Sequence, residues 1–157
     1  MKRRVDTVLV DRDLLWTTHV AARIISLAQD YVNESSLEVT LNEDAVVSAF
    51  RHPECSIYAL RVDAEFYGFA LVNPANLFVH ERIGSLSMFY VAPSFRDGRV
   101  AYKFMKDILD RELGNYTYFH SSSISEIDDR TTRAYEALLR RLGFSYISKN
   151  YVKKGWL

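Results

Sequence analysis

The chain has 157 residues, of which 48% are hydrophobic and 25% charged, and its twenty basic residues balance its twenty acidic ones. This length suits one core, so we expect a single domain over residues 1–157. The zero net charge excludes a general attraction to nucleic acid or anionic membranes, so neither is expected as a partner. Cys55 is the only cysteine, which excludes an internal disulfide and a cysteine-based zinc site. No apolar run is long enough for a membrane span, which predicts a soluble cytoplasmic protein.

The first third of the chain predicts one strand and two helices. Residues 5–10 are short and β-branched, as in a strand, and residues 14–32 carry apolar side chains at helical spacing. Asn42, followed by two acids, predicts the capped start of a second, short helix. His52 and Pro53 are expected to end it.

The middle of the chain changes to strand periodicity. Residues 56–62 and 66–72 predict a hairpin with a polar tip, and residues 86–91 predict a further strand. Residues 100–113 then follow a period of 3.6, and Gly114 suits the position just after a helix.

The last part of the chain adds two strands and a helix. Residues 116–120 are aromatic and β-rich, and Asp128 and Asp129 are expected to cap a helix that Gly143 ends. Residues 144–152 predict a final strand. The order of elements describes a mixed α/β domain with helices on both faces of one central sheet.

The loop before the third predicted helix is the best candidate for a binding site. A helix N-terminus offers free N–H groups and a partial positive charge, which favour anions and phosphates. Arg96 and Arg99 add guanidinium groups that can hold phosphate oxygens. The alternative is an ordinary strand-to-helix connection with surface arginines. No metal-like spacing relates His19, His52 and His80 to one another or to Cys55, so no metal is expected.

Three segments together resemble the GCN5-related N-acetyltransferases, or GNAT superfamily. They are VAPSFRDGRVA at residues 91–101, the hairpin DAEFYGFA upstream and the helix end AYEALLRRLGF downstream. The resemblance covers roughly Ser56 to Lys153 and is to small stand-alone members from phages and bacteria. It implies a GNAT-like α/β fold, with a mixed, mostly antiparallel sheet that splays at its fourth strand and holds acetyl-CoA in the opening. The residues it assigns to the cofactor are Phe89, Tyr90, Val91, Arg96, Asp97, Gly98, Arg99, Val100 and Ala101.

The match to the family pattern V-x-P-x-x-R-G-x-G-x-G is partial. Asp97 and Arg99 stand where the family usually has glycine. The Cβ of Arg99 can crowd the pyrophosphate, or its side chain can turn outward and bind a phosphate. The carboxylate of Asp97 repels a pyrophosphate unless an arginine pairs with it. We therefore expect weaker cofactor binding than the full pattern would give.

The family's chemistry is direct attack of an amine on the thioester, which needs a proton acceptor and a proton donor to the thiolate. The fourth strand, residues 86–91, carries no acid, so His120 at the end of the next strand is the candidate base; the alternative is a solvent-facing histidine. Leu139 occupies the position of the usual tyrosine donor. Tyr135, one helical turn earlier, is the candidate replacement, or else a core residue.

The acceptor side is less defined by the sequence. Glu34, in the loop after the first helix, is the candidate for holding a cationic amine, and a solvated loop acid is the alternative. The substrate is expected to be a small-molecule or peptide amine. The apolar end of the tail, Trp156 and Leu157, leaves a homodimer open.

Two functions follow from the resemblance: an acetyltransferase, located in the host cytoplasm if phage-encoded, or a catalytically impaired GNAT-fold protein that serves as a binding or structural subunit, for example in a virion.

Overall fold

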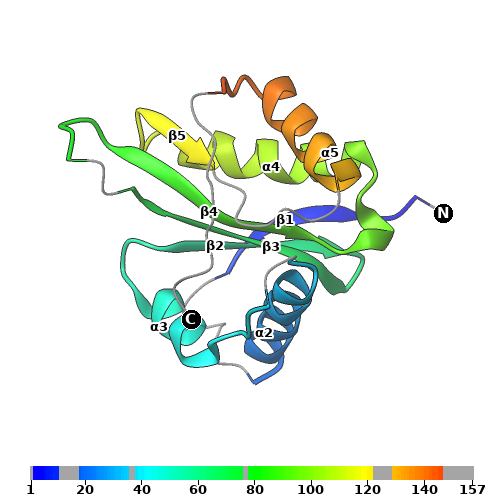
Figure 1. Cartoon of the computed structure of the whole chain (residues 1–157). Helices are drawn as coiled ribbons and strands as arrows, with labels where there is room; N and C mark the ends of the chain where they lie inside the picture. The colour runs from blue at the N-terminus through cyan, green and yellow to red at the C-terminus, as the bar shows by residue number, and fades with distance from the viewer. Residues whose placement is uncertain (1, 11–17, 36–37, 76–77, 122–128, 147–157) are drawn as a thin grey trace.

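The computed structural model describes residues 2–10, 18–35, 38–75, 78–121 and 129–146 (Figure 1). In chain order, its elements are β1 (Val5–Leu9), α2 (Thr18–Asn33), α3 (Glu43–Arg51), β2 (Ser56–Val62), β3 (Glu65–Pro74), β4 (Ile83–Val91), a single 3₁₀ turn (Pro93–Phe95), α4 (Gly98–Glu112), β5 (Tyr118–Ser121) and α5 (Asp129–Arg141).

The five strands form one open sheet in the order β1-β2-β3-β4-β5. The pairs β1–β2, β2–β3 and β3–β4 are antiparallel, and the pair β4–β5 is parallel. The sheet is therefore mixed and mostly antiparallel, as the sequence predicts.

Helices cover both faces of the sheet, which confirms the predicted layers (Figure 1). On the face covered by α2 and α3, here called the α2 face, the fully buried ring of Phe69 lies in the core. On the face covered by α4 and α5, here called the α4 face, the fully buried ring of Phe104 has the same place. Burying one such ring stabilises the fold by roughly 1.5–3 kcal/mol. Because each face of the sheet has its own core, packing on both faces stabilises the sheet.

The fourth strand changes its pairing halfway along. Against β3, Leu71 pairs with Met88 but Val72 pairs with Leu86, so Ser87 is an extra residue that forms a bulge. The hydroxyl of Ser87 lies 2.6 Å from the side-chain oxygen of Asn73. Against β5, only Ile83–Leu86 of β4 are paired. The residues that follow Ser121 lie outside the described ones, and the part of β4 beyond this pairing, residues 87–91, is here called the opening.

The predicted boundaries differ from the observed ones where packing decides them. The strand expected from residue 86 begins at Ile83, because Gly84 pairs with Pro74 on one side and with Phe119 on the other. The strand expected from Tyr116 begins at Tyr118, and the buried Tyr116 ring packs against Phe119 instead.

The helix ends follow the sequence more closely. Gly143 has a φ of +89° just after α5, so it ends this helix as predicted. Of the predicted final strand, residues 144–146 are not in a strand and the remainder lies outside the described residues. The expected first turn of α2, before Thr18, also lies outside them. Within the described ranges, no helix combines the length and apolarity that a membrane crossing requires.

Candidate functional site

A tyrosine from α5 lies beside the last described β4–β5 pair, Leu86 with Ser121. The hydroxyl of Tyr135 lies 2.7 Å from the hydroxyl of Ser121, the last residue of β5. Ser121 is the partner of Leu86 in the final β4–β5 pair, and the Tyr135 ring packs 5.9 Å from the ring of Phe89 on β4. Burial raises the pKa of Tyr135 to about 12, although the hydrogen bond with Ser121 acts in the opposite direction. The site therefore holds a phenol that stays protonated at neutral pH.

Tyr135 reaches this point although its sequence position is one turn away from that of the usual donor. Leu139, which occupies that position, packs against the core on the α4 face. The sequence does not single out Ser121, whose pairing with Leu86 appears only when β5 is aligned with β4.

The start of α4 is occupied by its own capping residue. Asp97 is the N-cap, and one of its carboxylate oxygens accepts hydrogen bonds from the backbone N–H groups of Arg99, at 3.1 Å, and Val100, at 2.8 Å. A cap of this kind stabilises a helix by about 1 kcal/mol. From the sequence alone, Asp97 is expected only to repel a bound pyrophosphate. Its capping role follows once α4 is seen to begin at Gly98 rather than at Val100.

The rest of this loop offers space and charge. A Cβ at Gly98 would have no other atom within 4 Å, and the side chain of Arg99 is exposed. Val100 and Ala101 instead turn inward and pack against the core on the α4 face, which fixes the first turn of the helix. This turn follows the end of β4 and the 3₁₀ turn in the chain.

The two predicted binding residues Arg96 and Glu34 contact each other. A guanidinium nitrogen of Arg96 lies 2.5 Å from one carboxylate oxygen of Glu34, and its Nε donates to the carbonyl of Val91 at 2.6 Å. The guanidinium also lies 5.3 Å from the centre of the Tyr90 ring, and the Tyr90 hydroxyl donates to Glu34 at 3.4 Å. Burial raises the pKa of Tyr90 to about 12, and the charge of Glu34 adds to this. Arg96 thus joins the loop before α4 to the end of α2.

The candidate base and the candidate acid lie on opposite faces of β5. Phe119 packs into the core on the α4 face, and Ser121 contacts Tyr135 on that same face. Because side chains alternate along a strand, His120 points to the α2 face. On β4, Phe89 and Val91 likewise belong to the α4 face, and Tyr90 belongs to the α2 face with Glu34.

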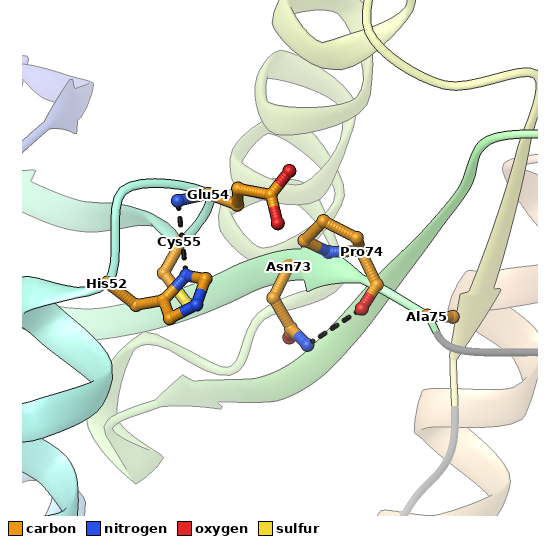
Figure 2. A pocket seen from close by; sticks show the side chains of 6 residues that line it. All are labelled: His52, Glu54, Cys55, Asn73, Pro74 and Ala75. Atoms are coloured by element: carbon orange, nitrogen blue, oxygen red, sulfur yellow. Dashed lines mark hydrogen bonds between the residues drawn. The ribbon is translucent and has the colours of Figure 1, made fainter.

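A separate cavity of about 490 Å³ lies at the other end of the strands (Figure 2). Its lining residues come from the loop before β2 and from the end of β3, and they are His52, Glu54, Cys55, Asn73, Pro74 and Ala75. Nδ1 of His52 accepts a hydrogen bond from the backbone N–H of Glu54 at 3.2 Å (Figure 2). Over the described part of the chain, no group of three or more His, Cys, Asp or Glu side chains is placed to hold a metal ion. The cavity is far along β3 and β4 from the start of α4, so it is not part of the opening between β4 and β5.

Comparison with known structures identifies the fold. An aminoglycoside N-acetyltransferase, AAC(6')-Iy, in complex with CoA has a TM-score of 0.70 and 14% identity over 99% of this chain and 97% of that chain. A ribosomal-protein-alanine N-acetyltransferase from Brucella melitensis biovar Abortus 2308 has a TM-score of 0.67 and 14% identity over 97% of this chain and 100% of that chain. The aminoglycoside acetyltransferase meta-AAC0020 from an uncultured soil metagenomic sample, in complex with sisomicin, has a TM-score of 0.65 and 6% identity over 97% of both chains.

Comparisons with protein-family models and with curated proteins give no match. The structural likenesses show that the chain has the GNAT acyltransferase fold that its sequence predicts.

Proposed function

We propose that this chain is a member of the GNAT superfamily and an acetyl-CoA-dependent N-acetyltransferase, which transfers the acetyl group by direct attack of an amine. The observation that carries this proposal is the parallel pairing of β5 with β4 up to Leu86 and Ser121, with the protonated hydroxyl of Tyr135 beside this last described pair. The likeness to acetyltransferases solved with CoA supports the choice of cofactor.

The residues around the opening fit an extended thioester ligand. Residues 87–91 of β4, which lie beyond the described β4–β5 pairs, carry backbone groups that can bind the pantetheine arm and polarise the thioester carbonyl. The open space around Gly98 and the exposed guanidinium of Arg99 suit the pyrophosphate at the start of α4. The bound acetyl-CoA supplies the activated acetyl group.

The α2 face would receive the amine. His120 points to this face and is our candidate for taking the proton of the attacking amine, directly or through water. Glu34 lies on the same side and can hold a cationic group of the acceptor, provided that the group replaces the guanidinium of Arg96. Several of the similar structures are acetyltransferases of aminoglycosides, which supports a small-molecule amine as the acceptor class.

The α4 face would receive the departing sulfur. When the C–S bond breaks, Tyr135 donates its proton to the sulfur, so that a thiol and not a thiolate leaves. Tyr135 is protonated at neutral pH, which is the form that this step needs. In a direct transfer the amine attacks from one side of the thioester carbon and the sulfur departs on the other. The candidate base and the candidate acid, on opposite faces of β5, suit these two positions.

The second candidate is a GNAT-fold binding or structural subunit that has lost catalysis. The capping contact of Asp97 favours this reading, because its carboxylate occupies the N–H groups that a pyrophosphate would use. Calorimetric titration with acetyl-CoA separates the two functions. At about 100 times its dissociation constant, the cofactor should stabilise the protein by roughly 2.7 kcal/mol, which a thermal shift would also show. Absence of binding at millimolar acetyl-CoA would reject the enzyme and leave the second candidate.

Replacing Asp97 by asparagine should tighten acetyl-CoA binding about tenfold. Asparagine caps a helix about as well as aspartate, so stability should change little, whereas the repulsion of a nearby phosphate charge is removed. The measurement is the calorimetric dissociation constant. Asp110→Asn, which removes one exposed negative charge from the same helix, is the matched control and should leave the constant unchanged. Equal affinity of D97N and the original protein would show that Asp97 does not compete with the cofactor.

A further inference from the structure

The contact between Ser121 and Tyr135 joins the two elements that flank the opening. Ser121 is the last residue of β5, and Tyr135 comes from the middle of α5. Their hydroxyl oxygens are 2.7 Å apart, and either one can be the donor. The centre of the Phe89 ring lies 5.9 Å from that of the Tyr135 ring, so Tyr135 contacts one side chain of β4 and one of β5. These contacts fix the Tyr135 ring, and its hydroxyl proton is the part that can still change direction.

The direction of this hydrogen bond decides what Tyr135 can do. A phenol has one proton, and if that proton is donated to Ser121 it cannot be given to a leaving group. If Ser121 donates instead, the Tyr135 proton is free to point into the opening. The same bond then stabilises the negative charge that grows on the phenolic oxygen as the proton leaves.

We infer that Ser121 is a positioning residue for Tyr135, whose hydroxyl donates to the phenolic oxygen and directs the phenolic proton toward the departing sulfur. This inference rests on the proposed function. In the transfer step, the amine nitrogen forms the C–N bond, the C–S bond breaks, and its electron pair stays on the sulfur, which takes the proton of Tyr135. The proton lost by the amine returns through solvent to the phenolate. The sum is amine plus thioester giving amide plus thiol.

A double-mutant cycle tests this role, because a general structural effect would be additive and a role through Tyr135 would not. Ser121→Ala should lower kcat about tenfold with little change in the KM for acetyl-CoA. The same substitution in a Tyr135→Phe protein should have no further effect on kcat. Ser121→Thr keeps a hydroxyl and should restore most of the rate. Ser56→Ala, which removes a half-buried hydroxyl at the start of β2, is the control and should keep full activity.

A second measurement uses the leaving group itself. An acetyl thioester of an aryl thiol releases a weakly basic thiolate that needs less protonation, so S121A should lose far less rate with it than with acetyl-CoA. Equal losses with both thioesters, or full additivity of S121A and Y135F, would overturn the inference while leaving the proposed function intact. If the original protein binds no acetyl-CoA in the calorimeter, the proposed function fails, and the inference fails with it.

Discussion

Replacing Tyr135 by phenylalanine is expected to lower kcat about 100-fold while the affinity for acetyl-CoA stays nearly unchanged. A positioned general acid contributes about 10²–10⁴-fold to a rate, and the hydroxyl is the only atom group that this substitution removes. The ring, which packs against Phe89, is retained, so the cost in stability should be about 1 kcal/mol for one lost hydrogen bond. Steady-state kinetics with a reactive amine and calorimetry with acetyl-CoA measure the two quantities separately.

The control for this experiment is another tyrosine outside the opening. Tyr102, half-buried on α4 beneath the guanidinium of Arg141, at 4.3 Å from its ring centre, can be changed to phenylalanine with the same loss of one hydroxyl. Y102F should keep the original kcat. If Y135F also keeps it, Tyr135 is a core residue and the proton for the thiolate comes from elsewhere.

Gly68→Ala should destabilise the protein by about 3 kcal/mol. A Cβ at this position would lie 2.5 Å from the backbone oxygen of Tyr90 and 3.2 Å from the Cβ of Leu60. Backbone oxygen cannot move aside as a flexible side chain can, so β4 itself must shift at Tyr90 and Val91, the segment that borders the opening. Chemical denaturation measures the loss in unfolding free energy.

A second glycine provides the comparison for this measurement. A Cβ at Gly114 would have no neighbour within 4 Å, so Gly114→Ala should change stability by no more than about 1 kcal/mol. If G68A were as stable as G114A, the close approach of β3 to β4 at Gly68 would not be a constraint. Loss of acetyl-CoA binding by folded G68A would link that constraint to the opening.

The parts of the fold that the sequence predicts are those set by neighbours along the chain. The capped start of α3 at Asn42 is visible because an Asn followed by two acids is a local signal, and the structure shows the Asn42 side chain accepting from the N–H of Ala45. Gly143 ends α5 for an equally local reason. The bulge at Ser87 has no such signal, because it appears only when β4 is aligned with β3.

In the candidate site too, the features set by neighbours along the chain are predicted and those set by contacts between distant segments are not. The strand, loop and helix that form the opening are contiguous and were predicted, but the pair of Arg96 with Glu34 joins residues 62 positions apart. The sequence around Arg96 predicts a phosphate as its partner, and the sequence around Glu34 predicts a cationic amine. Their mutual contact depends on how α2 packs against the sheet. Tyr135 could be counted along the helix but not placed, since the packing of α5 against the core on the α4 face brings its hydroxyl to Ser121.

The guanidinium of Arg96, which is paired with Glu34, competes with any cationic acceptor for the Glu34 carboxylate. An ammonium group that binds Glu34 takes the place of the Arg96 guanidinium, so the net charge around the carboxylate stays constant. Added salt should therefore weaken the binding of the ammonium group less than it weakens an ordinary ion pair. The displaced guanidinium would remain tethered next to the start of α4, where it adds a positive charge. If an acceptor amine releases Arg96 and the guanidinium then contacts a bound anion, the acceptor strengthens the binding of that anion. Because such coupling is reciprocal, the anion strengthens the binding of the acceptor by the same factor.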